Sequence, residues 1–190
     1  MSRVNSKGFS LVELLVALAI IVVTVSMASI GIGVLSSADS KAAVETIRSE
    51  LELERINSQA ISEDFYVKLS NEDKGIVVYS YRNASLLYTK KLGTRIGINL
   101  SFTDADKTTT KELEKGDSLY IMFSKESGGV SVFNLNGSVI NETQSLDGIS
   151  YIRTQIDGGT NYQDNNNITF IIKGRKTNRL TLYTKTGLFK

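Results

Sequence analysis

The residue with the most unusual chemical setting in this sequence is Glu13, an acid at the leading edge of a long uncharged run, residues 14–35. About 20 apolar residues suffice to cross a bilayer as a helix. A carboxylate inside a membrane is costly, so its presence there indicates a functional site. Phe9 lies four positions before Glu13, and both residues therefore lie on one side of a helix, one turn apart.

The residues around this acid carry a resemblance. Gly8-Phe9-Ser10-Leu11-Val12-Glu13-Leu14 resembles the processing site of type IV pilins and type II secretion pseudopilins, which are made as prepilins with a class III signal. The resemblance implies that a prepilin peptidase cuts between Gly8 and Phe9, that the new amine on Phe9 is methylated, and that Glu13 is the family's glutamate. It also implies other pilin or pseudopilin subunits as partners.

Elementary electrostatics gives this glutamate a role in assembly. The amine freed at Phe9 is cationic, and in an apolar bundle Glu13 of one subunit could pair with the Phe9 amine of its neighbour. Removing one member of such a pair leaves a buried charge unpaired, which is strongly destabilising. We therefore expect the pair to fix the axial register between subunits.

The flanking charges predict how the chain is oriented. Arg3 and Lys7 precede the apolar run, and positive charge favours the cytoplasmic side of a membrane. The expected organisation is a cleaved leader (residues 1–8), a transmembrane and assembly helix (9–35) and an extracytoplasmic globular domain (36–190). Before assembly the chain would cross the cytoplasmic membrane once, with its N-terminus inside, and afterwards it would belong to a fibre.

Two simpler interpretations of the N-terminus compete with this one. A secretory signal peptide has a shorter apolar core of about 7–15 residues, which ends at a small-residue cleavage site. A plain membrane anchor explains the length of the run but not Gly8-Phe9 followed by Glu13.

The helical pattern continues beyond the apolar run. Val44, Ile47 and Leu51 share one helix face, which we expect to pack against a sheet, while Glu45, Arg48, Glu52 and Arg55 occupy the other side. One continuous helix from about Phe9 to Ser62 is predicted. Gly31 and Gly33 are its weak points, because glycine costs about 1 kcal/mol in a helix interior.

From Phe65 the apolar period changes to two, which predicts strands. The expected strands are residues 65–69, 75–82, 85–92, 97–102, 118–123, 130–135, 149–156, 168–173 and 179–184. The polar stretches 103–116 and 157–167 are expected to be loops. A long N-terminal helix, transmembrane in its first half, packed on an antiparallel β-rich domain defines the predicted fold class, α+β.

The C-terminal end carries a second resemblance and most of the unbalanced charge. Residues 168–187 are similar to the C-terminal hairpin of GspH/FimT-type minor pilins, in which a strand, a glycine turn, a strand and a final glycine recur. From Ile168 onward there are six Lys or Arg and no acid. The candidate nucleic-acid-binding residues are Lys173, Arg175, Lys176 and Arg179, because a basic hairpin attracts phosphates. Gly174-Arg175 matches the start of the Gly-Arg-x-Arg motif that FimT-type pilins use on DNA, but the second arginine is missing.

Composition argues against an enzyme and a metal protein. The chain has no His and no Cys, which excludes conventional Ser-His-Asp and Cys-His arrangements and thiolate metal sites. The acidic stretches 104–108 and 157–161 do not fit the EF-hand loop. We expect no cofactor, no metal and no catalytic residue. The favoured function is a minor pilin or pseudopilin, with a DNA-binding minor pilin as the alternative and a membrane-anchored binding domain as the third hypothesis.

Overall fold

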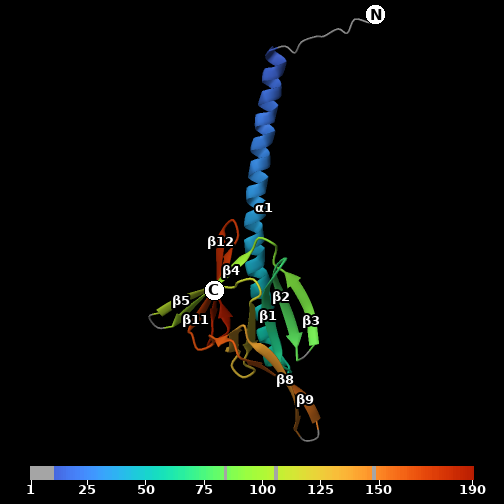
Figure 1. Cartoon of the computed structure of the whole chain (residues 1–190), viewed down its shortest axis with the longest axis vertical. Coiled ribbons are helices and arrows are strands. Elements are labelled where there is room, and N and C mark those ends of the chain that lie inside the picture. Colours follow the sequence, from blue (N-terminus) through green and yellow to red (C-terminus); the bar gives the residue numbers. More distant parts are fainter. Residues whose placement is uncertain (1–10, 84, 105–106, 147–148) are drawn as a thin grey trace, which may run out of the picture. The chain divides into compact units, whose positions relative to one another are not determined.

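A computed structural model describes residues 11–83, 85–104, 107–146 and 149–190 of the 190-residue chain, with side chains for all of these except residues 11, 13, 22–38, 104 and 146. The chain divides into two units, Met1–Ser36 and Ser37–Lys190. Helix α1, Leu11–Ala60, supplies the described part of the first unit and opens the second (Figure 1). The prediction of one helix through this region is confirmed between these bounds, and the helix is continuous across Gly31 and Gly33.

The second unit contains two larger antiparallel sheets and a separate hairpin. The first sheet has the strand order β10-β7-β6-β1-β2-β3, and the second has the order β13-β12-β11-β4-β5. Strands β8 (Ser138–Leu146) and β9 (Ile149–Asp157) pair only with each other among the described residues. The bounds of the first sheet are β1 Phe65–Glu72, β2 Gly75–Arg82, β3 Ser85–Lys91, β6 Ser118–Phe123, β7 Val130–Leu135 and β10 Thr160–Asn161. Those of the second are β4 Gly97–Asp104, β5 Lys107–Glu112, β11 Asn167–Lys173, β12 Thr177–Tyr183 and β13 Leu188–Phe189.

One hydrophobic core joins α1 to both larger sheets. Ile47 and Leu51 of the helix are fully buried, and Val44 packs against the same core, so the predicted packing face is confirmed. The strands contribute alternate residues, as a half-buried strand must. In β11 these are Ile168, Phe170 and Ile172, which belong to the same core as Leu180 and Leu182 of β12. The predicted α+β class with antiparallel sheets is therefore confirmed for this unit.

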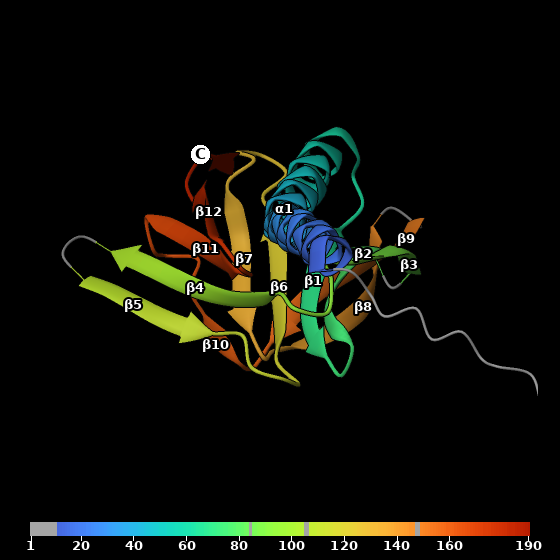
Figure 2. The same ribbon diagram turned by 90° about the horizontal axis from the view of Figure 1, so that it is seen from above.

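Two predicted loops are wrong in part, because each contains a strand. Stretch 103–116 includes β5, which pairs with β4 along its whole length, and stretch 157–167 includes β10. Every residue of β5 is exposed, so neither face shows the apolar alternation that marks a strand in a sequence. Its backbone bonds to β4 hold it instead, and Figure 2 shows it at the outer edge of its sheet. Strands β8 and β13 were also not predicted.

Candidate functional site

The residues predicted to be processed fall at the limit of the described chain. Gly8 and Phe9 lie outside the described residues, and Glu13 lies in the first turns of α1. The described apolar side chains around it face outward from their own unit. Val12, Leu14, Leu15, Val16 and Leu18 are between 53% and 69% exposed. Such a contiguous apolar surface usually marks a membrane or protein contact.

The membrane-spanning role of residues 14–35 stays a prediction. Among the described residues, no helix combines the length and the apolar character that crossing a membrane requires.

The four predicted nucleic-acid-binding cations surround the turn between β11 and β12. Lys173 is the last residue of β11, Arg175 and Lys176 lie in the turn, and Arg179 lies in β12. All four side chains are exposed, and none forms an ion pair within the described part of the chain. The fold therefore brings four free cations together on one short hairpin end.

Sequence reasoning missed a pair of buried carboxylates on α1. Glu50 and Glu54 are only 3% and 1% exposed, although they are one helical turn apart and both acidic. The Lys90 ammonium of β3 lies 2.5 Å from Glu50 Oε1, whereas Glu50 Oε2 and Glu54 Oε1 have no hydrogen-bond partner within the described residues. Burying a carboxylate oxygen that has no partner is unfavourable, because burial disfavours the charged form.

The pKa of Glu54 is raised to about 8, mainly because burial disfavours the charged form and also because the Glu50 carboxylate is close. A hydrogen bond with Ser80 offsets part of this shift. Burial and then a hydrogen bond with Glu50 raise the pKa of Tyr88 to about 12. At neutral pH this cluster therefore holds a protonated Glu54 next to the Glu50–Lys90 ion pair, which suits a structural contact between α1 and strands β2 and β3.

The spacing of the helix contains a signal that could have found these acids. Buried positions on α1 follow steps of three and four, as one helix face requires. Ser40, Ala43, Ile47, Leu51, Glu54 and Ser58 are the buried residues of this series, and Glu50 adjoins it. The two acids and Ser58 thus continue the apolar face that Ala43 and Ile47 begin.

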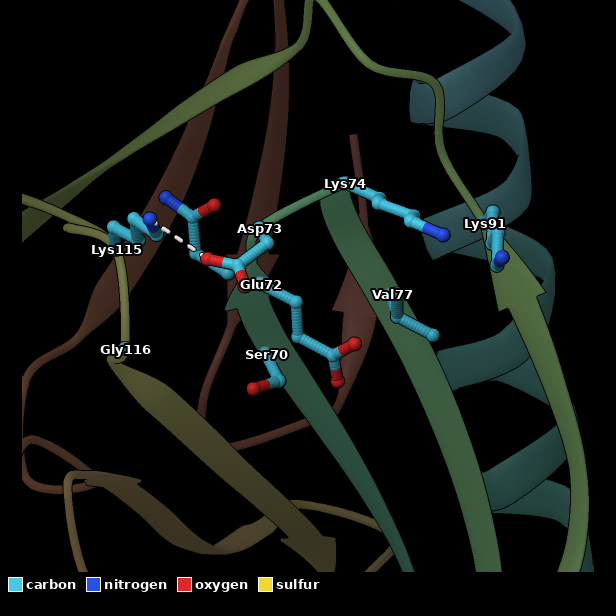
Figure 3. Close-up of a pocket in the computed structure, with 9 residues that line it drawn as sticks. Ser70, Glu72, Asp73, Lys74, Val77, Lys91, Lys115 and Gly116 are labelled. Carbon is cyan, nitrogen blue, oxygen red and sulfur yellow. Dashed lines mark ion pairs between the residues drawn. The ribbon is translucent and has the colours of Figure 1, made fainter.

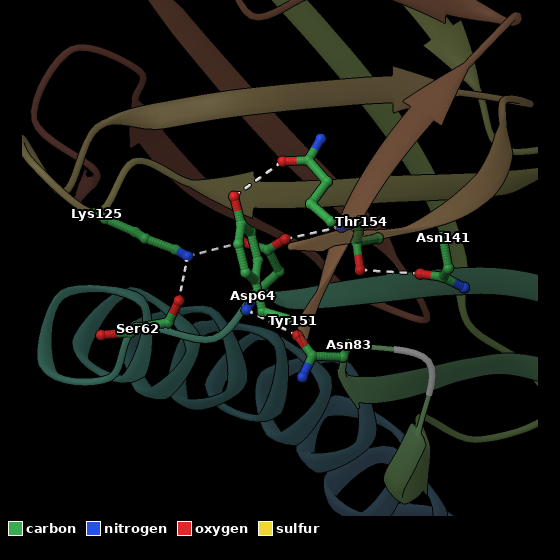
Figure 4. Close-up of polar contacts among 8 residues, drawn as sticks. Ser62, Asp64, Asn83, Lys125, Asn141, Tyr151 and Thr154 are labelled. Atoms are coloured by element: carbon green, nitrogen blue, oxygen red, sulfur yellow. Dashed lines mark hydrogen bonds and ion pairs between the residues drawn. The ribbon is translucent and has the colours of Figure 1, made fainter. Parts of the chain in front are cut away.

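A second polar cluster fixes the β8–β9 hairpin to the loop that follows α1 (Figure 4). Asp64 Oδ2 accepts a 2.7 Å hydrogen bond from the backbone N–H of Thr154 in β9, and Asp64 Oδ1 lies 2.9 Å from the Lys125 ammonium. The Asp64 backbone N–H donates to Asn83 at 3.0 Å. Asp64 is therefore the anchor of a hairpin that exposes Ile149 and Tyr151.

A cavity of about 640 Å³ lies at the β1–β2 turn (Figure 3). Charges of both signs line it, with Glu72 and Asp73 beside Lys74, Lys91 and Lys115. Lys115 pairs with Asp73 at 2.7 Å, and both side chains are largely exposed. Among the described residues no group of three or more acidic side chains is placed to hold a metal ion.

Comparison with known proteins places one segment in a described family. Residues 3–29 match the prokaryotic N-terminal methylation motif, the class III signal of type IV pilins. No curated protein and no solved structure matches the chain significantly. The motif indicates a pilin-like protein that is cut by prepilin peptidase, methylated and assembled with other pilins.

Proposed function

We propose that this protein is a minor pilin or pseudopilin, a structural subunit of a type IV pilus or a type II secretion-like fibre. Its leader, residues 1–8, is removed, and residues 9–35 hold the precursor in the cytoplasmic membrane and later hold the subunit in the fibre. The domain that follows lies outside the cytoplasm. The methylation motif at residues 3–29 and the uncharged run that follows Glu13 support this function.

The single observation that carries the proposal is the methylation motif at the start of α1. Behind it, the described side chains from Val12 to Leu18 are exposed. All of them except Ala17 are large and apolar. Water is a poor surrounding for such a surface, at about 25 cal/mol for each Å² exposed. Lipid first, and the helices of neighbouring subunits afterwards, would both cover it.

The Glu13 carboxylate gives the assembled state its register. In this proposal it meets the methylated amine of Phe9 from the neighbouring subunit inside the apolar bundle. The pair satisfies two charges that would otherwise be buried alone, and it forms only between chains that are correctly staggered.

Processing at Gly8 tests the proposal. Protein taken from its native host should begin at a methylated Phe9 when its intact mass is measured. Gly8→Val should keep the leader, since we expect the peptidase pocket to accept only a residue without Cβ, whereas Gly33→Val is a matched control that should be cut normally. A mature chain that begins at Met1, or after Ala28, would contradict the pilin function.

A second candidate function is binding of DNA during uptake, and the exposed cations Lys173, Arg175, Lys176 and Arg179 favour it. A turn of this kind offers contacts to phosphates and no evident base readout, so binding would be independent of sequence. About four phosphate contacts predict a log–log salt slope near −3.6. Arg175→Ala combined with Arg179→Ala should reduce that slope by about two contacts in a fluorescence-anisotropy titration with duplex DNA.

A further inference from the structure

The β11–β12 turn lies beside the first residues of the domain. The Asn178 side-chain amide donates a 2.9 Å hydrogen bond to Ser40 Oγ, and a Cβ added at Gly174 would lie 3.0 Å from the Cβ of Ser40. Figure 1 shows this turn next to α1. Ser40 is the fourth residue of the domain unit, which starts at Ser37. The turn is therefore packed at the end of the domain where the chain arrives from the apolar run.

Further cations border the same place. Lys41 follows Ser40 in the sequence. Arg95 precedes Ile96, which borders the turn, because a Cβ added at Gly174 would lie 3.6 Å from Ile96 Cδ1. Both side chains are exposed and form no ion pair within the described residues. We call this surface the basic rim, and it consists of Lys41, Arg95, Lys173, Arg175, Lys176 and Arg179.

Acidic neighbours do not neutralise the basic rim. Asp39 is exposed beside Ser40 and is the acid nearest to it in the chain. Asp73 lies two positions before Gly75, which approaches the Gly93–Thr94 backbone next to Arg95. Its carboxylate already pairs with Lys115. Glu72 accepts a hydrogen bond from the Tyr79 hydroxyl. The six cations of the basic rim thus outnumber the exposed acids on α1 beside Ser40 and Lys41, which are Asp39 and, one helical turn further on, Glu45.

Chain connectivity alone limits how far the basic rim can be from a bilayer that holds residues 14–35. Ser40 lies five positions after Leu35 in the sequence. They span at most about 18 Å when fully extended and about 7.5 Å as a helix. The Debye length at physiological ionic strength is about 8 Å. In either conformation Ser40, against which the β11–β12 turn packs, would lie within about two Debye lengths of Leu35 at the end of the apolar run.

We propose that the basic rim binds the phosphates of anionic lipid head groups on the outer face of the cytoplasmic membrane, before the subunit joins a fibre. The inference rests on the proposed function, because it requires residues 14–35 to be in the membrane. Each basic residue near an anionic surface strengthens such binding about fivefold. The contact would hold the domain against the membrane in one orientation and would be released during assembly.

Lipid fits this location better than DNA does. The residue that anchors the turn, Ser40, follows the apolar run by only five positions, so a bilayer that holds this run would be within reach of the turn. The lipid is also present at high local concentration, because the helix tethers the domain to it.

The full chain in lipid nanodiscs tests this inference. The sequence has no Cys, so Thr177→Cys, at the first residue of β12 directly after the turn, carries a unique fluorescent label. Head groups that bear a nitroxide quench this label when it is close to the lipid surface. Quenching should be stronger in discs with about one-third phosphatidylglycerol than in phosphatidylcholine discs, and raising the salt to 0.5 M, where the Debye length falls to roughly 4 Å, should remove the difference. The control label is Ser127→Cys, and it should not respond to the lipid. Ser127 is next to Gly128, which lies close to Gln59 at the other end of the domain part of α1.

A charge-matched pair of variants shows whether the cations cause the effect. Arg175→Gln with Lys176→Gln should lower the ratio of docked to undocked domain about 25-fold, from about fivefold per residue. Lys107→Gln with Lys185→Gln removes the same charge from exposed positions outside the basic rim and should leave the ratio unchanged. An equal loss in both pairs would overturn the inference, because it would show only a general effect of net charge.

The outcomes separate this inference from the proposed function. A chain that does not remain in either disc overturns the membrane insertion, and the inference with it. A chain that remains in both discs and is quenched equally overturns the lipid site alone. Equal quenching together with saturable binding of duplex DNA that needs Arg175 and Lys176 would assign the same cations to DNA.

Discussion

The two halves of α1 both place carboxylates among apolar residues, but they differ in where the partners come from. In the domain half, Glu50 and Glu54 are buried under β2 and β3, and Lys90 of the same chain meets Glu50. In the N-terminal half, Glu13 precedes the uncharged run, and the large apolar residues described around it are exposed.

The domain half of α1 is complete as part of a single molecule. The two acids of the domain half, their cation and the hydrophobic core all lie within residues 37–190. Their contacts therefore contribute to the folding free energy of the domain. The described side chains of the N-terminal half expose apolar surface that folding normally buries, and under the proposed function lipid or other subunits would cover it.

Glu13→Val should produce the largest effect. The variant should still be inserted and cut, but it would leave the Phe9 amine of a neighbour without a partner. Breaking a buried ion pair costs about 3–5 kcal/mol, which corresponds to a loss of more than about 100-fold in incorporation. Quantification of the subunit in sheared fibre fractions measures this. Glu45→Val, an exposed acid of the domain half, is the control, and equal incorporation of both variants would show that Glu13 makes no assembly contact.

The strands show where sequence patterns were sufficient. The bounds of β2, β6 and β7 were predicted to the residue, because apolar residues fill each strand and Gly or Asn turns flank it. Strands β5 and β8 left no such pattern. The first is wholly exposed, and within the described residues the second pairs with β9 alone, so backbone hydrogen bonds define both. A strand without a buried face leaves no hydrophobic period to read.

The candidate sites show a different limit. Glu50 and Glu54 were overlooked because a charged residue is expected to face water, and their partners on β2 and β3 are distant in the sequence. The cations of the β11–β12 turn could be named from the sequence, but their neighbour Ser40 is 138 positions from Asn178. Local patterns name chemical groups, and only the fold says which distant residues meet them.

Leu51→Ala should destabilise the domain strongly, whereas Leu53→Ala should not. Leu51 is fully buried in the core, so truncation leaves a cavity that costs about 3–5 kcal/mol. Leu53 lies two positions further along the same helix and is 43% exposed, so its loss should stay within about 0.5 kcal/mol. Urea denaturation of a chain beginning at Ser37 compares the two. Similar midpoints would mean that this face of α1 does not carry the core.

Glu54 should make the domain less stable as the pH rises. Its pKa is raised to about 8 in the folded chain, so between about pH 4.5 and 8 the folded state keeps a proton that the unfolded state releases. The contribution is complete below this window and is lost progressively through it, by a total on the order of 2–4 kcal/mol.

Glu54→Gln should remove this dependence, because the amide cannot ionise and has almost the same shape. The difference in unfolding free energy between the variant and the parent chain should grow in favour of the variant from pH 5 to pH 8. Glu45→Gln, at an exposed position on the same helix, should follow the parent chain at every pH. A parent chain with constant stability over this range would show that Glu54 is ionised in the fold.

Ser58→Ala should have the smallest effect and the opposite sign. Ser58 is 2% exposed, and its hydroxyl has no hydrogen-bond partner within the described residues. Removing a buried unsatisfied hydroxyl is favourable, and alanine is the better helix former, so we expect a gain of about 0.5–1 kcal/mol. Ser49→Ala is the matched control on the exposed face, where the hydroxyl donates a 2.9 Å bond to the Thr46 carbonyl. It should gain less, because it keeps the helix-propensity benefit but loses that bond. Urea midpoints that show Ser58→Ala to be destabilising would contradict this prediction. They would mean that the Ser58 hydroxyl donates a hydrogen bond to one of the buried carboxylates.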